Sequence, residues 1–67
     1  MIRLRLKEVL EEKGVGMGKL SRLSDVSYST IFRIVNDPTY SPSLNTLERI
    51  AKALNVPVSA LYEEIPD

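Results

Sequence analysis

The sequence contains no cysteine, no histidine and no tryptophan. Without cysteine there is no disulfide and no thiol nucleophile, and without histidine there is no imidazole base. The same two residues are the usual soft ligands of metal sites in proteins, so we expect no metal ion and no cofactor. These absences exclude most enzyme chemistry.

The residues that remain do not replace the missing chemistry. Glu11 and Glu12 are adjacent, so on a helix their carboxylates would point about 100° apart and could not converge on one bond. The serines have no histidine to activate them, and none lies three or four residues from a lysine. We therefore predict that the protein has no catalytic residues and is not an enzyme.

Long hydrophobic runs are also absent. The first residues, MIRLRLKEVLEEK, alternate charged and apolar side chains, whereas a signal peptide or a membrane helix needs an unbroken apolar run. A chain of 67 residues forms one domain at most and leaves no room for a separate ligand-sensing segment. We expect a soluble, cytoplasmic, single-domain protein spanning residues 1–67, with no membrane partner and no small-molecule ligand.

Net charge is missing as well, because nine lysines and arginines balance nine aspartates and glutamates. A nucleic-acid binder is usually strongly basic, so the sum argues against one. The distribution is uneven, however. Residues 1–33 carry seven basic and four acidic side chains (net +3), and residues 34–67 carry two basic and five acidic ones (net −3). A modest positive face is therefore compatible with the sequence.

A helical periodicity of apolar residues is present along most of the chain, and no segment alternates like a strand. The expected helices span residues 2–13, 17–24, 28–36 and 44–54, with a short fifth helix from about residue 58. The apolar positions expected to share the buried side of the first, second and fourth helices are Ile2, Leu6, Val9, Leu10, Leu20, Leu23, Leu44, Leu47, Ile50, Ala51 and Leu54. The pattern predicts a compact all-α fold.

Short polar residues mark the ends of these helices. Ser27 and Ser43 precede helices, and their hydroxyls can cap the first turn. Asp25 and Asn55 follow helices, where a residue in the left-handed conformation commonly ends one. The third helix should end before Asp37, because the proline that follows disfavours helical backbone in the preceding residue.

The third helix has two different faces. Ile31, Ile34 and Val35 share the side that must meet the core. Four other side chains form a contiguous patch on the opposite side, namely Tyr28, Ser29, Phe32 and Arg33. Wheel geometry allows two interpretations: Phe32 is tucked against the second helix and Arg33 is a solvated charge, or the helix enters a DNA major groove.

Two longer motifs carry a resemblance that favours the second interpretation. LSRLSDVSYSTIFRI and SPSLNTLERIAKALNVPVSAL resemble the motifs of the phage repressor and Cro type, or XRE-like, DNA-binding family. The similarity covers roughly residues 4–62. It implies a five-helix, lambda-repressor-like domain with a helix-turn-helix at about residues 17–36. It also implies a repressor-like transcriptional regulator at the nucleoid, which binds a palindromic operator in double-stranded DNA as a homodimer.

The resemblance also assigns roles to individual residues. It makes Tyr28, Ser29, Phe32 and Arg33 the base-contacting set. The positions that it places at the DNA backbone are Met17 (through its N–H group), Lys19, Ser27, Thr30, Asn36 and Tyr40. Such backbone contacts position a protein on DNA without reading the sequence.

The chain departs from the family pattern at several places. Met17 stands where the family usually has a glutamine that reaches the DNA backbone, and Asp25 replaces the usual glycine of the turn. Leu10 and Val35 occupy positions where some members have a buried Arg–Glu pair; an apolar pair there can be equally stable. With the neutral net charge, Met17 and Asp25 favour an alternative: a small helical protein-interaction module, for example antitoxin-like, with weak or no DNA binding.

Apolar residues near the carboxyl end exceed what the core needs. We expect a dimer interface at Val56, Val58, Tyr62 and Ile65. The competing interpretation is that Val58, Leu61 and Ile65 only close the core over the first helix, and the sequence does not decide between the two.

Overall fold

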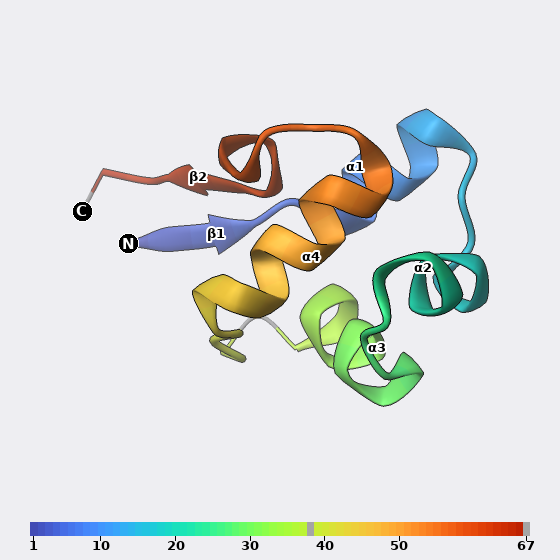
Figure 1. Ribbon diagram of the computed structural model, residues 1–67. Helices are drawn as coiled ribbons and strands as arrows, with labels where there is room; N and C mark the ends of the chain where they lie inside the picture. The colour runs from blue at the N-terminus through green and yellow to red at the C-terminus, as the bar shows by residue number, and fades with distance from the viewer. Residues whose placement is uncertain (38, 67) are drawn as a thin grey trace.

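The computed structural model describes residues 1–37 and 39–66 (Figure 1). In chain order the elements are strand β1 (Ile2–Leu4), helices α1 (Leu6–Lys13), α2 (Met17–Ser24), α3 (Tyr28–Asn36) and α4 (Leu44–Leu54), the 3-10 helix η1 (Val58–Leu61), and strand β2 (Tyr62–Glu64). Figure 1 shows β1 and β2 side by side, while α2 and α3 form a pair at a distance from them.

The prediction of an all-α, five-helix fold is wrong in two respects. β1 and β2 pair as an antiparallel sheet in which Arg3 lies opposite Glu63. The first helix begins at Leu6 and not at Ile2, and the predicted fifth helix is a short 3-10 helix that ends at Leu61. Backbone bonds join the two chain ends on either side of the ribbon: the Arg5 N–H donates to the Leu61 carbonyl at 2.7 Å and the Ile65 N–H to the Met1 carbonyl at 2.8 Å.

The predicted helix ends are confirmed. Asp25 and Asn55 adopt left-handed backbone, with φ of 57° and 56°. Ser27 and Ser43 cap α3 and α4, since each hydroxyl accepts a hydrogen bond from the N–H group three residues ahead. α3 ends at Asn36, as expected; the proline on which that expectation rested, Pro38, lies outside the described residues.

The core draws its fully buried side chains from several elements. These are Leu6 of α1, Leu20 of α2, Ile31 of α3, Ile50 of α4 and Leu61 of η1. α2 packs against both α3 and α4, so the helix-turn-helix is anchored on the longest helix. Three core predictions are wrong: Ile2, which lies in β1, is 53% exposed, Leu23 is 55% exposed and Leu44 is 63% exposed. The buried stripe of α2 and that of α4 are therefore narrower than the stripes of apolar residues in the sequence.

No helix in the described part of the chain combines the length and the apolar character that crossing a membrane requires.

Candidate nucleic-acid interface

α3 presents the patch that the sequence predicted. Ile31 and Ile34 are buried, whereas Tyr28 and Phe32 are 50% and 49% exposed. Ser29 and Arg33 are exposed on the same side. The structure therefore brings the four residues of the predicted base-contacting set together on one surface of the helix. Phe32 keeps about half of its surface exposed, so it is available to a partner whichever of the two interpretations of this helix holds.

The two aromatic side chains of the patch contact each other. The Tyr28 and Phe32 ring centroids are 6.5 Å apart, with an angle of 29° between the ring planes. The residues are four apart on the helix, so one ring lies over the other along the helix axis. The stack shields part of each ring and leaves a continuous apolar surface about one turn long. Such a surface can contact thymine methyl groups or the apolar side chains of a protein.

Arg33 has partners in the loop that follows the helix. Its guanidinium carbon, Cζ, lies 4.5 Å from the centroid of the Tyr40 ring, in a cation–π arrangement. A guanidinium nitrogen of Arg33 is 3.9 Å from the Asp37 carboxylate, too far for a hydrogen bond. Sequence reasoning missed this contact, because it depends on how the loop folds back over the helix.

Asp37 organises that loop. Its Oδ1 accepts hydrogen bonds from the Thr39 N–H at 2.9 Å and from the Thr39 hydroxyl at 2.6 Å. These two bonds, with a smaller contribution from the charge of Arg33, hold the pKa of Asp37 below its ordinary value. The Asp37 carbonyl also accepts from the Tyr40 N–H at 3.1 Å. The short distance from Asp to Thr in the sequence is the signal that could have indicated this turn.

Two serines hold the turn between α2 and α3. Ser24 is buried; its hydroxyl donates to the Leu20 carbonyl at 2.7 Å and accepts from the Val26 N–H at 3.3 Å. The Ser21 hydroxyl donates to the Val26 carbonyl at 2.7 Å. Neither serine was expected to have this role from the sequence. The bonds fix the turn, and so fix how α3 is presented relative to α2.

The predicted backbone-contacting residues lie around the ends of α2 and α3. Ser27 and Thr30 share a hydroxyl–hydroxyl hydrogen bond of 2.8 Å at the start of α3. At its other end the Asn36 side-chain amide donates to the Phe32 carbonyl at 3.0 Å. The remaining positions divide by exposure: Lys19 is exposed, whereas Met17 and Tyr40 are half-buried. Gly16, the N-cap of α2, supplies no side-chain cap to the first N–H groups of that helix.

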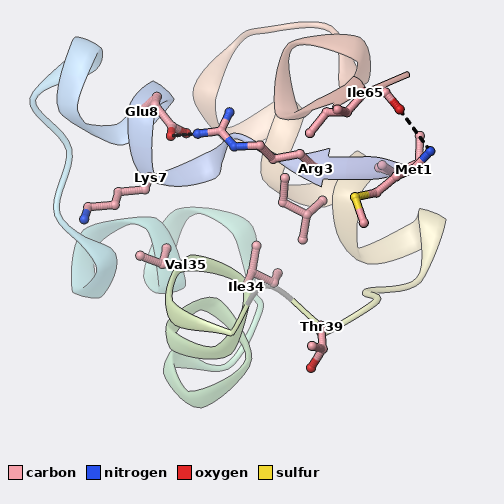
Figure 2. Close-up of a pocket in the computed structure, with 10 residues that line it drawn as sticks. Met1, Arg3, Lys7, Glu8, Ile34, Val35, Thr39 and Ile65 are labelled. Carbon is pink, nitrogen blue, oxygen red and sulfur yellow. Dashed lines mark hydrogen bonds and ion pairs between the residues drawn. The ribbon is translucent and has the colours of Figure 1, made fainter. Parts of the chain in front are cut away.

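The opposite side of α3 faces β1 across a groove (Figure 2). Arg3 of β1 bridges two elements there, with one nitrogen 2.8 Å from Glu8 of α1 and another hydrogen-bonded to Glu63 of β2. The hydrogen bond to Glu63 and the charge of Glu8 raise the pKa of Arg3. These contacts join β1 to α1 and β2. They involve no residue of α2 or α3.

The four residues of the predicted dimer interface do not form a single cluster. All are half-buried, and Val56 and Val58 pack partly against the core and line one groove beside α4. Tyr62 lines a different groove together with Ile2 and Leu44.

Ile65, the remaining member of the predicted dimer interface, lines the groove of Figure 2.

Among residues 1–37 and 39–66 there is no group of three or more acidic, cysteine or histidine side chains placed to hold a metal ion.

Comparison with known proteins assigns the family. The sequence matches the family model of the Cro/C1-type HTH DNA-binding domain over residues 5–67, which is nearly the whole chain. No match was found among curated proteins. The matched region contains α2, α3 and the turn held by Ser21 and Ser24, and it agrees with the resemblance that the two sequence motifs carry. The chain belongs to the Cro/C1-type helix-turn-helix family of DNA-binding domains.

Proposed function

We propose that the protein is a sequence-specific, repressor-like transcriptional regulator that places α3 in the DNA major groove and acts as a homodimer. The observation that carries the proposal is the exposed patch of α3, in which an arginine, a serine and two stacked aromatic rings lie together on one side of a capped helix. An α-helix fits the major groove, where each base pair presents a distinct set of donors, acceptors and methyl groups. In the cell such a protein acts at the nucleoid.

Each member of the patch has a chemistry suited to bases. The planar guanidinium of Arg33 can donate two parallel hydrogen bonds to O6 and N7 of guanine. Ser29 can donate or accept, and Phe32 and Tyr28 offer apolar surface to thymine methyl groups. These side chains therefore predict that the base pairs facing α3 in the major groove include guanine and thymine.

Contacts to phosphates would come from both ends of the helix-turn-helix. Lys19 is the exposed cation of α2 among the predicted positions, and Ser27, Thr30, Asn36 and Tyr40 are polar groups around α3. The N–H groups at the start of α2, which include that of Met17, can also donate to a phosphate. Few of these groups are charged, so we expect binding to depend on salt less steeply than it does for strongly basic regulators.

A homodimer follows from how little one helix can read. Two copies related by a two-fold axis read half-sites about 10 bp apart, which gives a palindromic operator. The proposal is supported by apolar residues that the core leaves exposed: Ile2 and Leu44 are 53% and 63% exposed and line one groove with Tyr62. We propose that this groove, with Tyr62 from the predicted interface, contributes to the dimer contact alongside Val56, Val58 and Ile65.

Selection of bound DNA from a random pool tests the proposal. The expected result is enrichment of a two-fold symmetric sequence. The protein should bind a duplex with this sequence about 1000-fold or more tightly than a scrambled duplex, and the affinity should fall as the salt concentration rises. Equal affinity for selected and scrambled DNA at every salt concentration would refute sequence-specific binding.

A second candidate is a protein-interaction module that uses the same face of α3. The half-exposed Tyr28–Phe32 stack favours it, because aromatic side chains commonly anchor protein interfaces. Replacing Arg33 with Ala distinguishes the two candidates. DNA binding should lose about 1–3 kcal/mol together with discrimination at one base pair. A protein partner that relies on the aromatic stack should be far less sensitive to the loss of this one charge, and much more sensitive to Phe32→Ala.

A further inference from the structure

The loop after α3 holds the side chain best suited to read a base. The Arg33 guanidinium lies over the Tyr40 ring, with Cζ 4.5 Å from the ring centroid, and 3.9 Å from the Asp37 carboxylate. Both partners come from the loop and not from α3's core face. We infer that Tyr40, held in place by the Asp37 turn, orients the Arg33 guanidinium before DNA arrives, so that Tyr40 is a positioning residue for base discrimination. This inference rests on the proposed function.

The geometry leaves the donors of Arg33 available. A guanidinium stacked on a ring uses its face, whereas its N–H groups point outward in its own plane. The carboxylate at 3.9 Å attracts the charge without forming a directed hydrogen bond. Arg33, whose side chain is 60% exposed, can therefore keep its stacked orientation and still offer two parallel donors to guanine.

Orienting Arg33 in advance has a physical benefit. A free arginine side chain samples many rotamers and loses that freedom when it binds a base edge. If the stack already restricts the rotamers in the free protein, less entropy is lost on binding. The benefit applies to the base that matches the preset orientation, so it raises discrimination more than it raises affinity for DNA in general.

The loop supplies the rigidity that this role requires. Asp37 accepts two hydrogen bonds from Thr39 through its side chain and one from the Tyr40 N–H through its backbone carbonyl. Tyr40 is itself half-buried and packs against the edge of the core. The turn and the contact with the core thus both hold the Tyr40 ring, over which the Arg33 guanidinium lies.

Three variants test the inference on a DNA duplex selected by the wild-type protein. The quantity measured is the ratio of affinities for that duplex and for one in which the guanine contacted by Arg33 is replaced. Tyr40→Leu removes the aromatic face and should lower the ratio about five-fold. Tyr40→Phe keeps the face and should leave the ratio unchanged. Asp37→Asn keeps an oxygen acceptor for Thr39 and should also preserve the ratio, although affinity for all duplexes should rise.

The Arg33→Ala background separates positioning from direct contact. If Tyr40 acts through Arg33, adding Tyr40→Leu to Arg33→Ala should leave the ratio unchanged, although the loss of the phosphate contact proposed for Tyr40 should lower the affinity for both duplexes equally. If Tyr40→Leu leaves the ratio unchanged in the wild-type background as well, and only lowers affinity for both duplexes, Tyr40 contacts phosphates without orienting Arg33 and the inference is wrong. The inference is also overturned if Tyr40→Phe lowers the ratio as much as Tyr40→Leu.

A measurement on the free wild-type protein needs neither DNA nor a folded variant. The ring current of Tyr40 should shift the side-chain protons of Arg33 upfield relative to those of the exposed Arg22 and Arg49. Absence of that shift would overturn the inference while leaving the proposed function intact. Conversely, if no duplex is selected by the wild-type protein, the proposed function fails whatever the NMR result.

Discussion

Leu20 and Leu23 lie three residues apart on α2, yet the first is fully buried and the second is 55% exposed. Removing the Leu20 side chain leaves a cavity in the core, and we expect Leu20→Ala to lower the free energy of unfolding by about 2–5 kcal/mol. Leu23→Ala removes the same atoms from a solvated position and should change it by about 0.5 kcal/mol or less. Urea unfolding followed by circular dichroism measures both. Equal losses in the two variants would contradict the burial described for α2.

Asp37 gives a prediction for pH. Hydrogen bonds from Thr39 favour its ionised form, so its pKa in the folded protein lies below the ordinary value of 3.8. A group whose pKa is lowered by folding stabilises the protein above its ordinary pKa, and that contribution is lost as the pH falls through the folded pKa. The turn that carries Tyr40 should therefore loosen only in acid.

Thr39→Val tests the cause of that shift. The change removes the hydroxyl donor and keeps the shape of the side chain, so the pKa of Asp37 should move up toward 3.8. An NMR titration of the Asp37 carboxyl carbon measures the midpoint in each protein. Identical midpoints in wild type and Thr39→Val would show that the hydroxyl of Thr39 does not hold the carboxylate.

At the residue scale, sequence reasoning identified side chains by local chemistry. It placed Tyr28, Phe32 and Arg33 on one exposed face because helix periodicity alone determines that arrangement. It could not place Tyr40 over Arg33, since that contact joins a helix to a loop whose path depends on tertiary packing. It also placed Leu23 in the core, because periodicity gives the direction of a side chain and not the width of the surface that covers it.

At the element scale, the turn between α2 and α3 depends on Asp25, whose backbone is left-handed with φ of 57°. A side chain in this conformation is strained, and glycine removes the strain. We expect Asp25→Gly to raise the free energy of unfolding by about 0.5–1 kcal/mol. The change also removes a negative charge from the end of α2, so affinity for all DNA sequences should rise.

Asn55→Gly is the matched control for that variant. Asn55 adopts the same left-handed backbone, with φ of 56°, at the end of α4 and outside the helix-turn-helix. The Asn55→Gly variant should raise the free energy of unfolding to a similar degree, measured by thermal or urea unfolding, without changing the affinity for DNA. If Asn55→Gly raised DNA affinity as much as Asp25→Gly, the position of the charge would not be the reason.

The elements also differ in how well the sequence predicts them. α4 has a serine cap, a long apolar stripe and an asparagine end, and its bounds agree with the prediction. β1 and β2 have three residues each, which is too short for an alternating pattern to appear. What makes them strands is pairing between the two ends of the chain, including the Arg3–Glu63 contact, and no local pattern reports a partner about 60 residues away.

For the whole molecule, the proposed dimer predicts a role for Leu44. It is 63% exposed and lines one groove with Ile2 and Tyr62. We expect Leu44→Glu to convert a dimer into a monomer and to weaken operator binding, because it buries a carboxylate in the contact. A carboxylate in the first turn of α4 is compatible with the helix dipole, so the monomer should remain folded.

Leu23→Glu provides the control for this prediction. Leu23 is also more than half exposed, but it lies on α2 and outside that groove. Light scattering at two protein concentrations should give a monomer for Leu44→Glu and the wild-type mass for Leu23→Glu. A wild-type mass for both variants would place the dimer contact elsewhere, for example at Val56 and Val58.

The family and the helix-turn-helix could be predicted from the sequence because two motifs report them across nearly the whole chain. The surface proposed for a dimer contact could not be predicted in the same way, since how far each apolar residue near the carboxyl end is buried depends on the packed fold. Val56 and Val58 pack partly against the core, whereas Ile2 and Leu44 are exposed although the apolar periodicity of the sequence placed both on a buried helix face.

In the proposed complex, α3 reads bases in the major groove and Arg33 reads guanine. Methylation of guanine at N7 adds a group in that groove, at one of the two atoms that Arg33 should contact. We therefore predict that, in a methylation-interference experiment on the selected operator, one guanine per half-site blocks wild-type binding when methylated. The Arg33→Ala protein should be insensitive at that guanine. If no guanine interferes, or if the same guanine interferes equally with Arg33→Ala, α3 does not read the groove through Arg33.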